Sequence, residues 1–310
     1  MQADLPQPVG AGAAERVRGR TAVVTGANAG LGLATATALA SMGMKTLCVC
    51  RSRERGEKAV AAIKEKTGND DVHLKVCDVS SLSQLRELAA SLQDEPVHVL
   101  VNNAGVLINE AGRTEDGLEL SFATNTLGTF AATELLLPSL KRAASDADFA
   151  PRVVAVSSGG MYSEPLEVDD LQNERLTAKG KKWDGVKAYA YDKRRQVALT
   201  EKWAAKYADT GVKFVSMHPG WADTPGVQTS LPDFRESMQK RLRTNEQGAD
   251  TIVWLAAVDT SKLQSGEFYL DRAVAKKHLL CSGTRYSDEK RDLLYERMQA
   301  FLAAPAIASA

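Results

Sequence analysis

Two side chains able to exchange protons stand four residues apart in the sequence, at Tyr189 and Lys193. In a helix this spacing puts both on one face, one turn apart. Free Tyr has a pKa of about 10 and free Lys about 10.4, so neither is an ideal acid or base near neutrality. A nearby ammonium favours the phenolate and lowers the pKa of the Tyr. The pair predicts a Tyr189 that protonates a carbonyl oxygen or deprotonates an alcohol.

The same pair could belong to an ordinary amphipathic helix. A second pair, Tyr191 and Arg195, has the same spacing. We disfavour it because a guanidinium, with a pKa above about 12, does not readily relay a proton. The interpretation of Tyr189 and Lys193 therefore depends on the other motifs in the chain.

A glycine-rich turn lies between a strand-like run, Thr21–Thr25, and the first helical pattern. Glycines at this place let the chain turn tightly and let backbone N–H groups approach a pyrophosphate at the helix N-terminus. An unliganded glycine turn is the alternative. The residues of this turn that we expect to bind a dinucleotide are Gly26, Asn28, Gly30, Leu31 and Gly32.

The end of the second predicted strand indicates which dinucleotide binds. An NAD enzyme usually has Asp or Glu there, about 20 residues past the glycines, to bind the ribose 2′-hydroxyl. This chain has Arg51, and a guanidinium can bind a 2′-phosphate that a carboxylate would repel. Arg51 could instead begin a solvated, charged helix. The missing carboxylate favours NADP(H) over NAD(H).

Further motifs follow strands in a fixed order: Val101–Gly105, then Ser157–Ser158, then the helix with Tyr189 and Lys193. With the glycine turn they resemble the classical short-chain dehydrogenase/reductase (SDR) family, over roughly residues 19–271. A narrower likeness is to the dehydrogenase/reductase SDR family member 12 group. It is carried by residues 156–161, 193–197, 216–227, 247–251 and 266–272.

The resemblance implies roles for single residues. Ser158, with Ser157 as the less favoured candidate, would hydrogen-bond the substrate oxygen. Asn125 would keep a helix open and hold a water linked to Lys193, which would also hold the nicotinamide ribose. Tyr189 would be the general acid or base. The further cofactor contacts expected by resemblance are Asp78 and Val79 beside the adenine, Asn103, Ala104 and Gly105, and Pro219, Gly220 and Thr224 near the nicotinamide.

Two departures from the family pattern concern the site. Ser158 and Tyr189 are 31 positions apart, a wide separation that implies an inserted substrate loop at about residues 159–187. Asp192 stands where a Ser is common; its carboxylate either perturbs Lys193 or faces solvent. Met161, Tyr162 and Trp183 are either a substrate wall or packing within that loop. His218 is expected to be a strand-end residue rather than a catalyst.

Alternating strand-like and helical patterns continue from residue 21 to residue 218. Such repeats predict a single-domain, doubly wound α/β fold of the Rossmann type, with helices on both faces of a parallel sheet. The expected strands are 21–25, 46–50, 72–77, 97–101, 152–157 and 213–218; the expected helices are 30–43, 57–66, 82–92, 117–137 and 192–208. We expect a loose leader at 1–18, the domain at 19–282, and a C-terminal helix and tail at 283–310.

Composition narrows the class of protein. Lys plus Arg and Asp plus Glu number 39 each in 310 residues, and such neutrality argues against nucleic-acid or anionic-membrane binding. No run of about 18 apolar residues and no signal-peptide pattern is visible, so we expect a cytoplasmic protein. Cys48, Cys50, Cys77 and Cys281 lack zinc-ligand spacing and are expected to be buried thiols; no metal is predicted.

The prediction is an NADP(H)-dependent oxidoreductase acting on a small-molecule carbonyl or alcohol. Family resemblance leaves a homo-oligomer open. One alternative is an NADPH-binding regulatory protein without turnover, which would not need the Tyr, Lys, Ser and Asn set. A retinol dehydrogenase-like enzyme is another, although those relatives often carry a membrane anchor that this N-terminus does not show. A sugar-nucleotide epimerase is less favoured because its glycine spacing usually differs.

Overall fold

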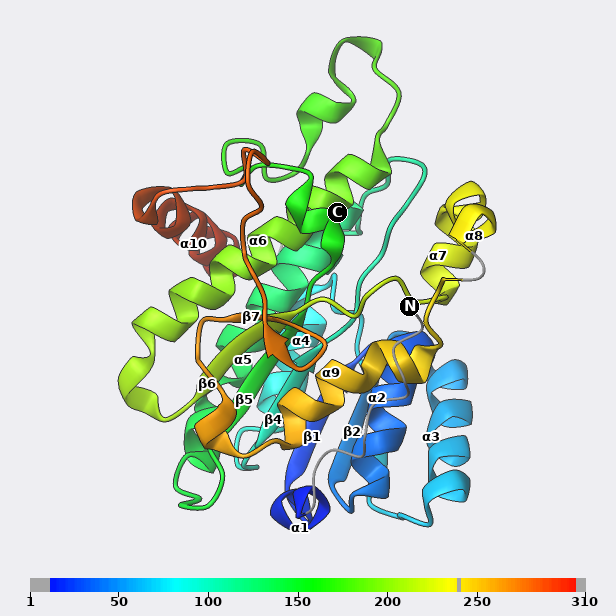
Figure 1. The fold of residues 1–310 in the computed structure, drawn as a ribbon, viewed down its shortest axis with the longest axis vertical. Coiled ribbons are helices and arrows are strands. Elements are labelled where there is room, and N and C mark those ends of the chain that lie inside the picture. Colours follow the sequence, from blue (N-terminus) through cyan, green and yellow to red (C-terminus); the bar gives the residue numbers. More distant parts are fainter. Residues whose placement is uncertain (1–11, 239–240, 305–310) are drawn as a thin grey trace.

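An eight-stranded sheet forms the centre of the protein, in the order β3-β2-β1-β4-β5-β6-β7-β8 (Figure 1). The computed structural model describes residues 12–238 and 241–304. Neighbouring strands from β3 to β7 pair in parallel, and only β8 runs antiparallel, against β7. The strands are β1 (Thr21–Thr25), β2 (Lys45–Cys50), β3 (Val72–Val76), β4 (Val99–Asn102), β5 (Arg152–Val156), β6 (Lys213–Met217), β7 (Phe268–Leu270) and β8 (Ala273–Val274).

Helices cover both faces of this sheet, because successive apolar side chains of the strands point to opposite sides. Val23 joins one buried cluster and Val24 the other. One face carries α1 (Ala13–Val17), α2 (Gly30–Ser41), α3 (Arg53–Thr67) and α9 (Asn245–Ala257). The other carries α4 (Leu82–Ala90), α5 (Gly128–Ala143), α6 (Gly185–Lys206) and α10 (Asp288–Ala303). The predicted single-domain α/β fold is confirmed.

Short helices complete the chain between these elements. A π-helical turn, η1 (Phe122–Leu127), precedes α5, and α7 (Pro225–Ser230) and α8 (Pro232–Met238) follow β6. The single-turn 3₁₀ segments are η2 (Gly159–Tyr162), η3 (Glu174–Leu176), η4 (Ala178–Gly180), η5 (Ala208–Thr210) and η6 (Thr260–Lys262). No helix within residues 12–238 and 241–304 is both long and apolar enough to span a bilayer.

Several boundaries differ from the sequence prediction. Helix α6 begins at Gly185 rather than Asp192, because the Asp184 side chain accepts a hydrogen bond from the Lys187 N–H at 2.9 Å and caps the helix. Helix α9 and strand β7 were not predicted. A capping box between Thr244 and Gln247 starts α9, a signal that is visible in the sequence.

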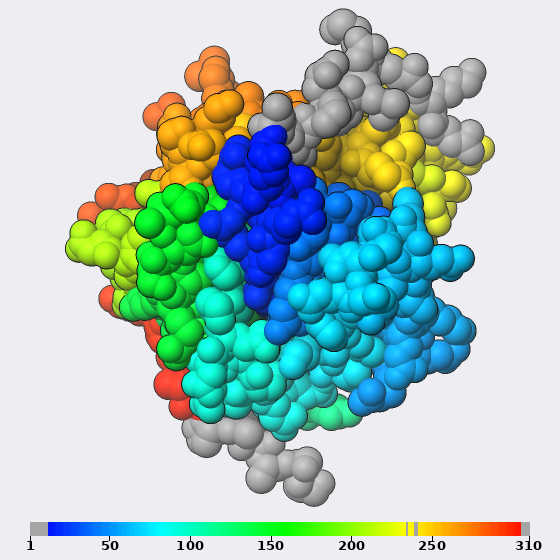
Figure 2. Space-filling view, turned by 90° about the horizontal axis from the view of Figure 1, so that it is seen from below, coloured from blue at the N-terminus to red at the C-terminus, as the bar shows by residue number. Residues whose placement is uncertain are grey.

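The expected leader is partly ordered. Residues 1–11 lie outside the described part of the chain, but Ala13–Val17 form α1, with Ala13 and Val17 buried against α9. Figure 2 shows this segment, in dark blue, on the lower surface beside the green segment near residue 150. Residues 12–18 are therefore not a loose leader. Cys281 also departs from prediction, since its thiol is exposed while the other three are buried.

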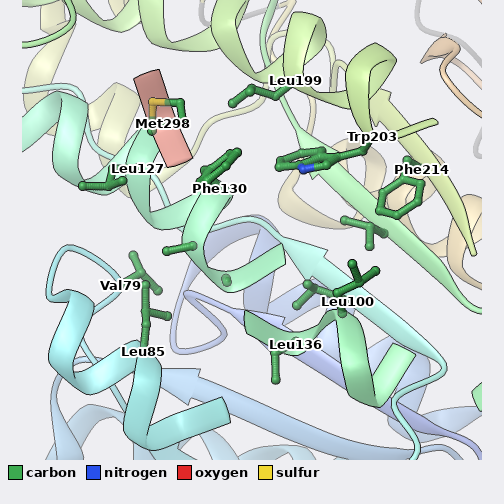
Figure 3. Close-up of a cluster of buried hydrophobic side chains, with 14 of the residues drawn as sticks. Val79, Leu85, Leu100, Leu127, Phe130, Leu136, Leu199, Trp203, Phe214 and Met298 are labelled. Carbon is green, nitrogen blue, oxygen red and sulfur yellow. The ribbon is translucent and has the colours of Figure 1, made fainter. Parts of the chain in front are cut away.

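The core beneath α10 joins three helices (Figure 3). Phe130 of α5 stacks on Trp203 of α6 with 5.8 Å between ring centroids, and meets the Tyr295 ring of α10 edge-on. The Glu134 carboxylate accepts hydrogen bonds from Trp203 Nε1 at 2.8 Å and from the Tyr295 hydroxyl at 2.9 Å. Met298 is fully buried in the same cluster. Helix α10 is therefore an integral part of the domain.

This packing predicts the effect of shortening Met298. Met298→Ala should lower the free energy of unfolding by about 2–4 kcal/mol, because a cavity opens where the side chain packed. Glu296→Ala, at an exposed position of the same helix, should change it by less than about 0.5 kcal/mol. Urea titration followed by circular dichroism measures both; equal effects would show that α10 is not docked as described.

Candidate active site

A cleft of about 380 Å³ opens at the carboxyl ends of the strands, the edge where doubly wound sheets bind ligands. Its wall is built from the loops after β1, β2, β3, β4, β5 and β6, together with α6 and α7. Of the residues predicted from the sequence, those lining it are Gly26, Asn28, Gly30, Leu31, Arg51, Asp78, Val79, Asn103, Ala104, Gly105, Ser158, Tyr189, Lys193, Pro219, Gly220 and Thr224. Gly32 and Asn125 do not line it.

The glycine turn leaves backbone donors facing the cleft. Helix α2 begins at Gly30 with Ala29 at its N-cap, where no side chain satisfies the first N–H groups, and such a helix start suits a phosphate. Gly26 has a φ of 67°, a backbone conformation that favours glycine. Gly32 lies behind the cleft and allows a close approach of the backbone, because a Cβ there would lie 2.2 Å from the Gly26 carbonyl oxygen. The turn therefore fits a dinucleotide.

Two arginines, rather than one, lie at the end of β2. The Arg51 side chain is 61% exposed, and its guanidinium lies 3.7 Å from the Asp78 carboxylate. Arg55, one turn into α3, also lines the cleft. The sequence analysis did not single out Arg55, although its four-residue spacing from Arg51 was visible. This end of the cleft is therefore cationic on the β2 side.

The motif after β4 fastens the glycine turn to the sheet. The Thr25 hydroxyl accepts hydrogen bonds from the backbone N–H groups of Asn103 and Ala104 at 3.0 and 2.9 Å. Asn103 Nδ2 donates to the Thr25 carbonyl at 2.8 Å. A Cβ added to Gly105 would lie 3.4 Å from Lys193 Nζ. The motif thus shapes the cleft floor between the glycine turn and Lys193.

Tyr189 and Ser158 meet in the cleft. The Ser158 hydroxyl lowers the pKa of the neighbouring Tyr189 phenol and accepts from the Gly160 N–H at 3.2 Å. Ser157 also lines the cleft, but its hydroxyl donates to the Lys193 backbone carbonyl at 2.8 Å. Burial raises the pKa of Tyr189 to about 12, against a smaller lowering by Ser158. The expectation that Lys193 lowers this pKa is not met, since desolvation of the phenolate dominates.

Lys193 lies one turn along α6, with its Nζ 5.2 Å from the centre of the Tyr189 ring. Two of its N–H groups are engaged: Nζ donates to the Val156 carbonyl at 2.8 Å and to Gln196 Oε1 at 3.2 Å. Burial lowers the pKa of Lys193 to about 8, and the Asp192 carboxylate opposes that shift. Because this pKa lies only slightly above neutral pH, Lys193 is mostly protonated at pH 7.

Asn125 lies in the π-helical turn η1 and is fully buried. Its side chain closes onto the loop after β4, accepting from the Val106 N–H and donating to the Val106 carbonyl, both at 2.8 Å. The Asn125 carbonyl accepts a hydrogen bond from Gln196 Nε2 at 2.8 Å. This hydrogen bond ties the backbone of η1 to α6.

Asp192 does not face solvent. Its fully buried carboxylate accepts hydrogen bonds from the Ser121 and Thr126 hydroxyls at 2.8 and 2.7 Å. Arg195 Nη1 donates to it at 3.0 Å, and the same guanidinium donates to the Glu167 carbonyl at 2.9 Å. The aspartate therefore links α6 to η1, while Arg195 ties α6 to the loop before it.

The other residues that the sequence analysis considered near the substrate make contacts within the protein. Met161 is fully buried, the Tyr162 hydroxyl donates to the Lys276 carbonyl, and Trp183 Nε1 donates to the Ile108 carbonyl at 2.9 Å. They fit the loop-packing alternative and do not line the cleft. His218 follows β6, where its Nδ1 accepts from the Gly159 N–H at 3.0 Å, and burial lowers its pKa to about 4.

Helix α7, drawn in yellow next to α8 in Figure 1, lines the cleft with Pro225, Gly226 and Val227. The Ser230 hydroxyl donates to the Leu107 carbonyl at 2.6 Å, joining α7 to the loop after β4. Apolar side chains of this part that the sequence analysis missed are Val106, Leu107, Trp221, Val227 and Leu231. They follow neither a strand nor a helix period, so no sequence signal marked them.

Comparison with known proteins agrees with this geometry. Residues 20–165 match the short chain dehydrogenase family model. Dehydrogenase/reductase SDR family member 12 of Bos taurus is 42% identical over 247 residues, which span 79% of this chain and 74% of that protein. Human retinol dehydrogenase 11 is 33% identical over 228 residues, spanning 72% and 68%.

Solved structures share the fold. An uncharacterized protein from Mycobacterium paratuberculosis has a TM-score of 0.71 at 24% identity, over 94% of this chain and 98% of that one. L-Sorbose reductase from Gluconobacter frateurii, complexed with NADPH and L-sorbose, has a TM-score of 0.63 at 19% identity, over 82% and 95%.

The fold, the glycine turn, the order of the motifs around the cleft and the sequence relatives lead to one conclusion. The chain belongs to the classical short-chain dehydrogenase/reductase family of nicotinamide-dependent oxidoreductases and lies with its SDR family member 12 group.

Proposed function

We propose that this protein is an NADP(H)-dependent oxidoreductase that moves a hydride between nicotinamide and a carbonyl or alcohol. The observation that carries the proposal is that Ser158, Tyr189 and Lys193 line the same cleft as the glycine turn. A proton donor, a hydroxyl beside it and a dinucleotide-binding turn thereby share one cleft. Proton transfer to the reacting oxygen and hydride transfer to the adjoining carbon could occur there together.

Bound NADPH would supply the hydride to the carbonyl carbon. The Ser158 hydroxyl would donate a hydrogen bond to the carbonyl oxygen, and Tyr189 would give its phenolic proton to the same oxygen, so that C=O becomes CH–OH. With a pKa of about 12, the Tyr189 phenol is protonated at neutral pH and poised for reduction. In oxidation the Tyr189 phenolate takes the proton back.

Cofactor preference follows from the charges at the end of β2. Arg51 and Arg55 both line the cleft there, and two guanidinium groups complement a 2′-phosphate. Asp78 lies across from them, 3.7 Å from Arg51, at the place where the adenine is expected. Two positive guanidinium groups against one carboxylate leave this end of the cleft positively charged, which favours NADP(H) over NAD(H).

The substrate is proposed to be apolar around its reacting group. The walls contributed by Leu107, Trp221, Val227 and Leu231 are apolar, as binding sites for apolar ligands usually are. One curated relative is named as a retinol dehydrogenase, and retinol is an apolar alcohol. A retinoid therefore belongs in the panel of alcohols and aldehydes used to seek turnover.

Removing the phenolic hydroxyl tests the proposed acid–base. Tyr189→Phe should lower the rate of NADPH oxidation with an apolar aldehyde by about 10²–10⁴-fold while NADPH still binds, because only proton transfer is lost. Tyr191→Phe is the matched control, since Tyr191 lies on the same helix but does not line the cleft. Full turnover in Tyr189→Phe would contradict the mechanism. NADPH binding without turnover of any carbonyl in the unaltered protein would support a regulatory role instead.

Reversing the charge at Arg51 tests the cofactor assignment. Arg51→Asp should weaken NADPH binding by on the order of 1–3 kcal/mol, because a charge-assisted contact is replaced by repulsion, and NADH binding should change less. Arg53→Asp makes the same charge change at an exposed residue outside the cleft lining. Fluorescence titration gives the dissociation constants. An unchanged NADPH-to-NADH preference in Arg51→Asp would show that Arg51 does not determine the cofactor preference.

A further inference from the structure

A buried glutamine joins Lys193 to the π-helical turn η1. The Gln196 side chain is fully buried, three residues after Lys193 on α6. Its Oε1 accepts a hydrogen bond from Lys193 Nζ at 3.2 Å, and its Nε2 donates to the Asn125 carbonyl at 2.8 Å. Nε2 also donates to the Thr129 hydroxyl at 3.0 Å. The amide thus spans the gap between Lys193 and Asn125.

The orientation of this amide is fixed by its partners. A backbone carbonyl only accepts hydrogen bonds, so the amide nitrogen must face Asn125. The amide oxygen then faces Lys193, where it accepts from an ammonium, which only donates. Both Nε2 hydrogens are engaged, by Asn125 and Thr129. The Gln196 amide therefore has all its hydrogen-bonding groups engaged, and only one orientation of the amide satisfies these partners.

We propose that Gln196 is a positioning residue for the acid–base pair, holding the Lys193 ammonium beside Tyr189 by linking it to η1. This inference rests on the proposed function, because it assigns Gln196 a role in the same reaction.

The charges around Lys193 make its protonation sensitive to Gln196. On α6 the titratable groups facing it are Tyr189 and the Asp192 carboxylate. The elements packed against it contribute uncharged groups: the Val156 carbonyl at the end of β5, Gly105 after β4, and Asn125 in η1 through the bridge. Burial disfavours the ammonium, and the acceptor on Gln196 favours it.

Two variants should shift this protonation in opposite directions. Gln196→Met removes the acceptor at similar size, so the pH at which Lys193 loses its proton should fall by about one unit. Gln196→Glu places a carboxylate there and should raise it by about one unit. The ¹³Cε resonance of Lys193, assigned by its loss in Lys193→Arg, reports this midpoint in ¹³C-lysine-labelled protein without cofactor or turnover.

Activity gives a second, separate readout. In the reduction direction, the basic limb of kcat/KM against pH should move with the NMR midpoint, downward in Gln196→Met and upward in Gln196→Glu. Thr200→Val is the control: Thr200 is also buried on α6 and donates to the Gln196 backbone carbonyl at 2.8 Å. Its loss should affect stability without moving either midpoint.

The outcomes separate this inference from the proposed function. An unchanged Lys193 midpoint in both Gln196 variants, or an equal shift in Thr200→Val, would overturn the positioning role whatever the activity. Opposite shifts in a protein that reduces no carbonyl would uphold the contact between Gln196 and Lys193 and contradict the proposed reaction. Opposite shifts together with a moving kcat/KM limb are the result we expect.

Discussion

The parallel register of β1, β4, β5 and β6 is the constraint on which the site depends. Val24 pairs with Val101, Val101 with Val154, and Val154 with Val215, so all four strands end at one edge of the sheet. The loops that follow carry, in order, the glycine turn, the Asn103 motif, Ser158 and Pro219. Parallel strands buried on both faces place loops distant in sequence within one cleft, and each loop needs only a local change to alter its chemistry.

Helix α6 then adds the groups that move protons, and a buried polar network fixes its position. Asp192 accepts from the hydroxyls of Ser121 and Thr126 at η1. Arg195 donates to three carbonyls of the loop before α6, those of Glu167, Asp170 and Leu171. Removing one partner from such a pair leaves an uncompensated buried charge, which is strongly destabilising. The face of α6 that carries Tyr189 is thereby held against both the sheet and the substrate loop.

Sequence patterns predicted the framework because each pattern reflects one local rule. Alternating strands and helices gave the fold class, and Gly26 and Gly30 marked a turn that few other residues permit. The pattern could not show that Asp192 is buried, because a helical period places it beside Arg195 without revealing what covers them. It missed Arg55, α9 and the apolar wall from α7. It also did not reveal the contacts of Gln196 with Lys193 and the Asn125 backbone carbonyl, since a side chain reaching across two helices has no signature in sequence.

The central claim is that this cleft carries a hydride from the nicotinamide ring to a carbonyl carbon. Deuterium transfer tests it directly: the protein would be incubated with NADPH deuterated on one face of C4, then on the other, and with a panel of apolar aldehydes. We predict deuterium at the carbinol carbon of the product alcohol from one face only, as a single fixed cofactor geometry requires. Cofactor binding with no deuterated alcohol from either face would contradict the account.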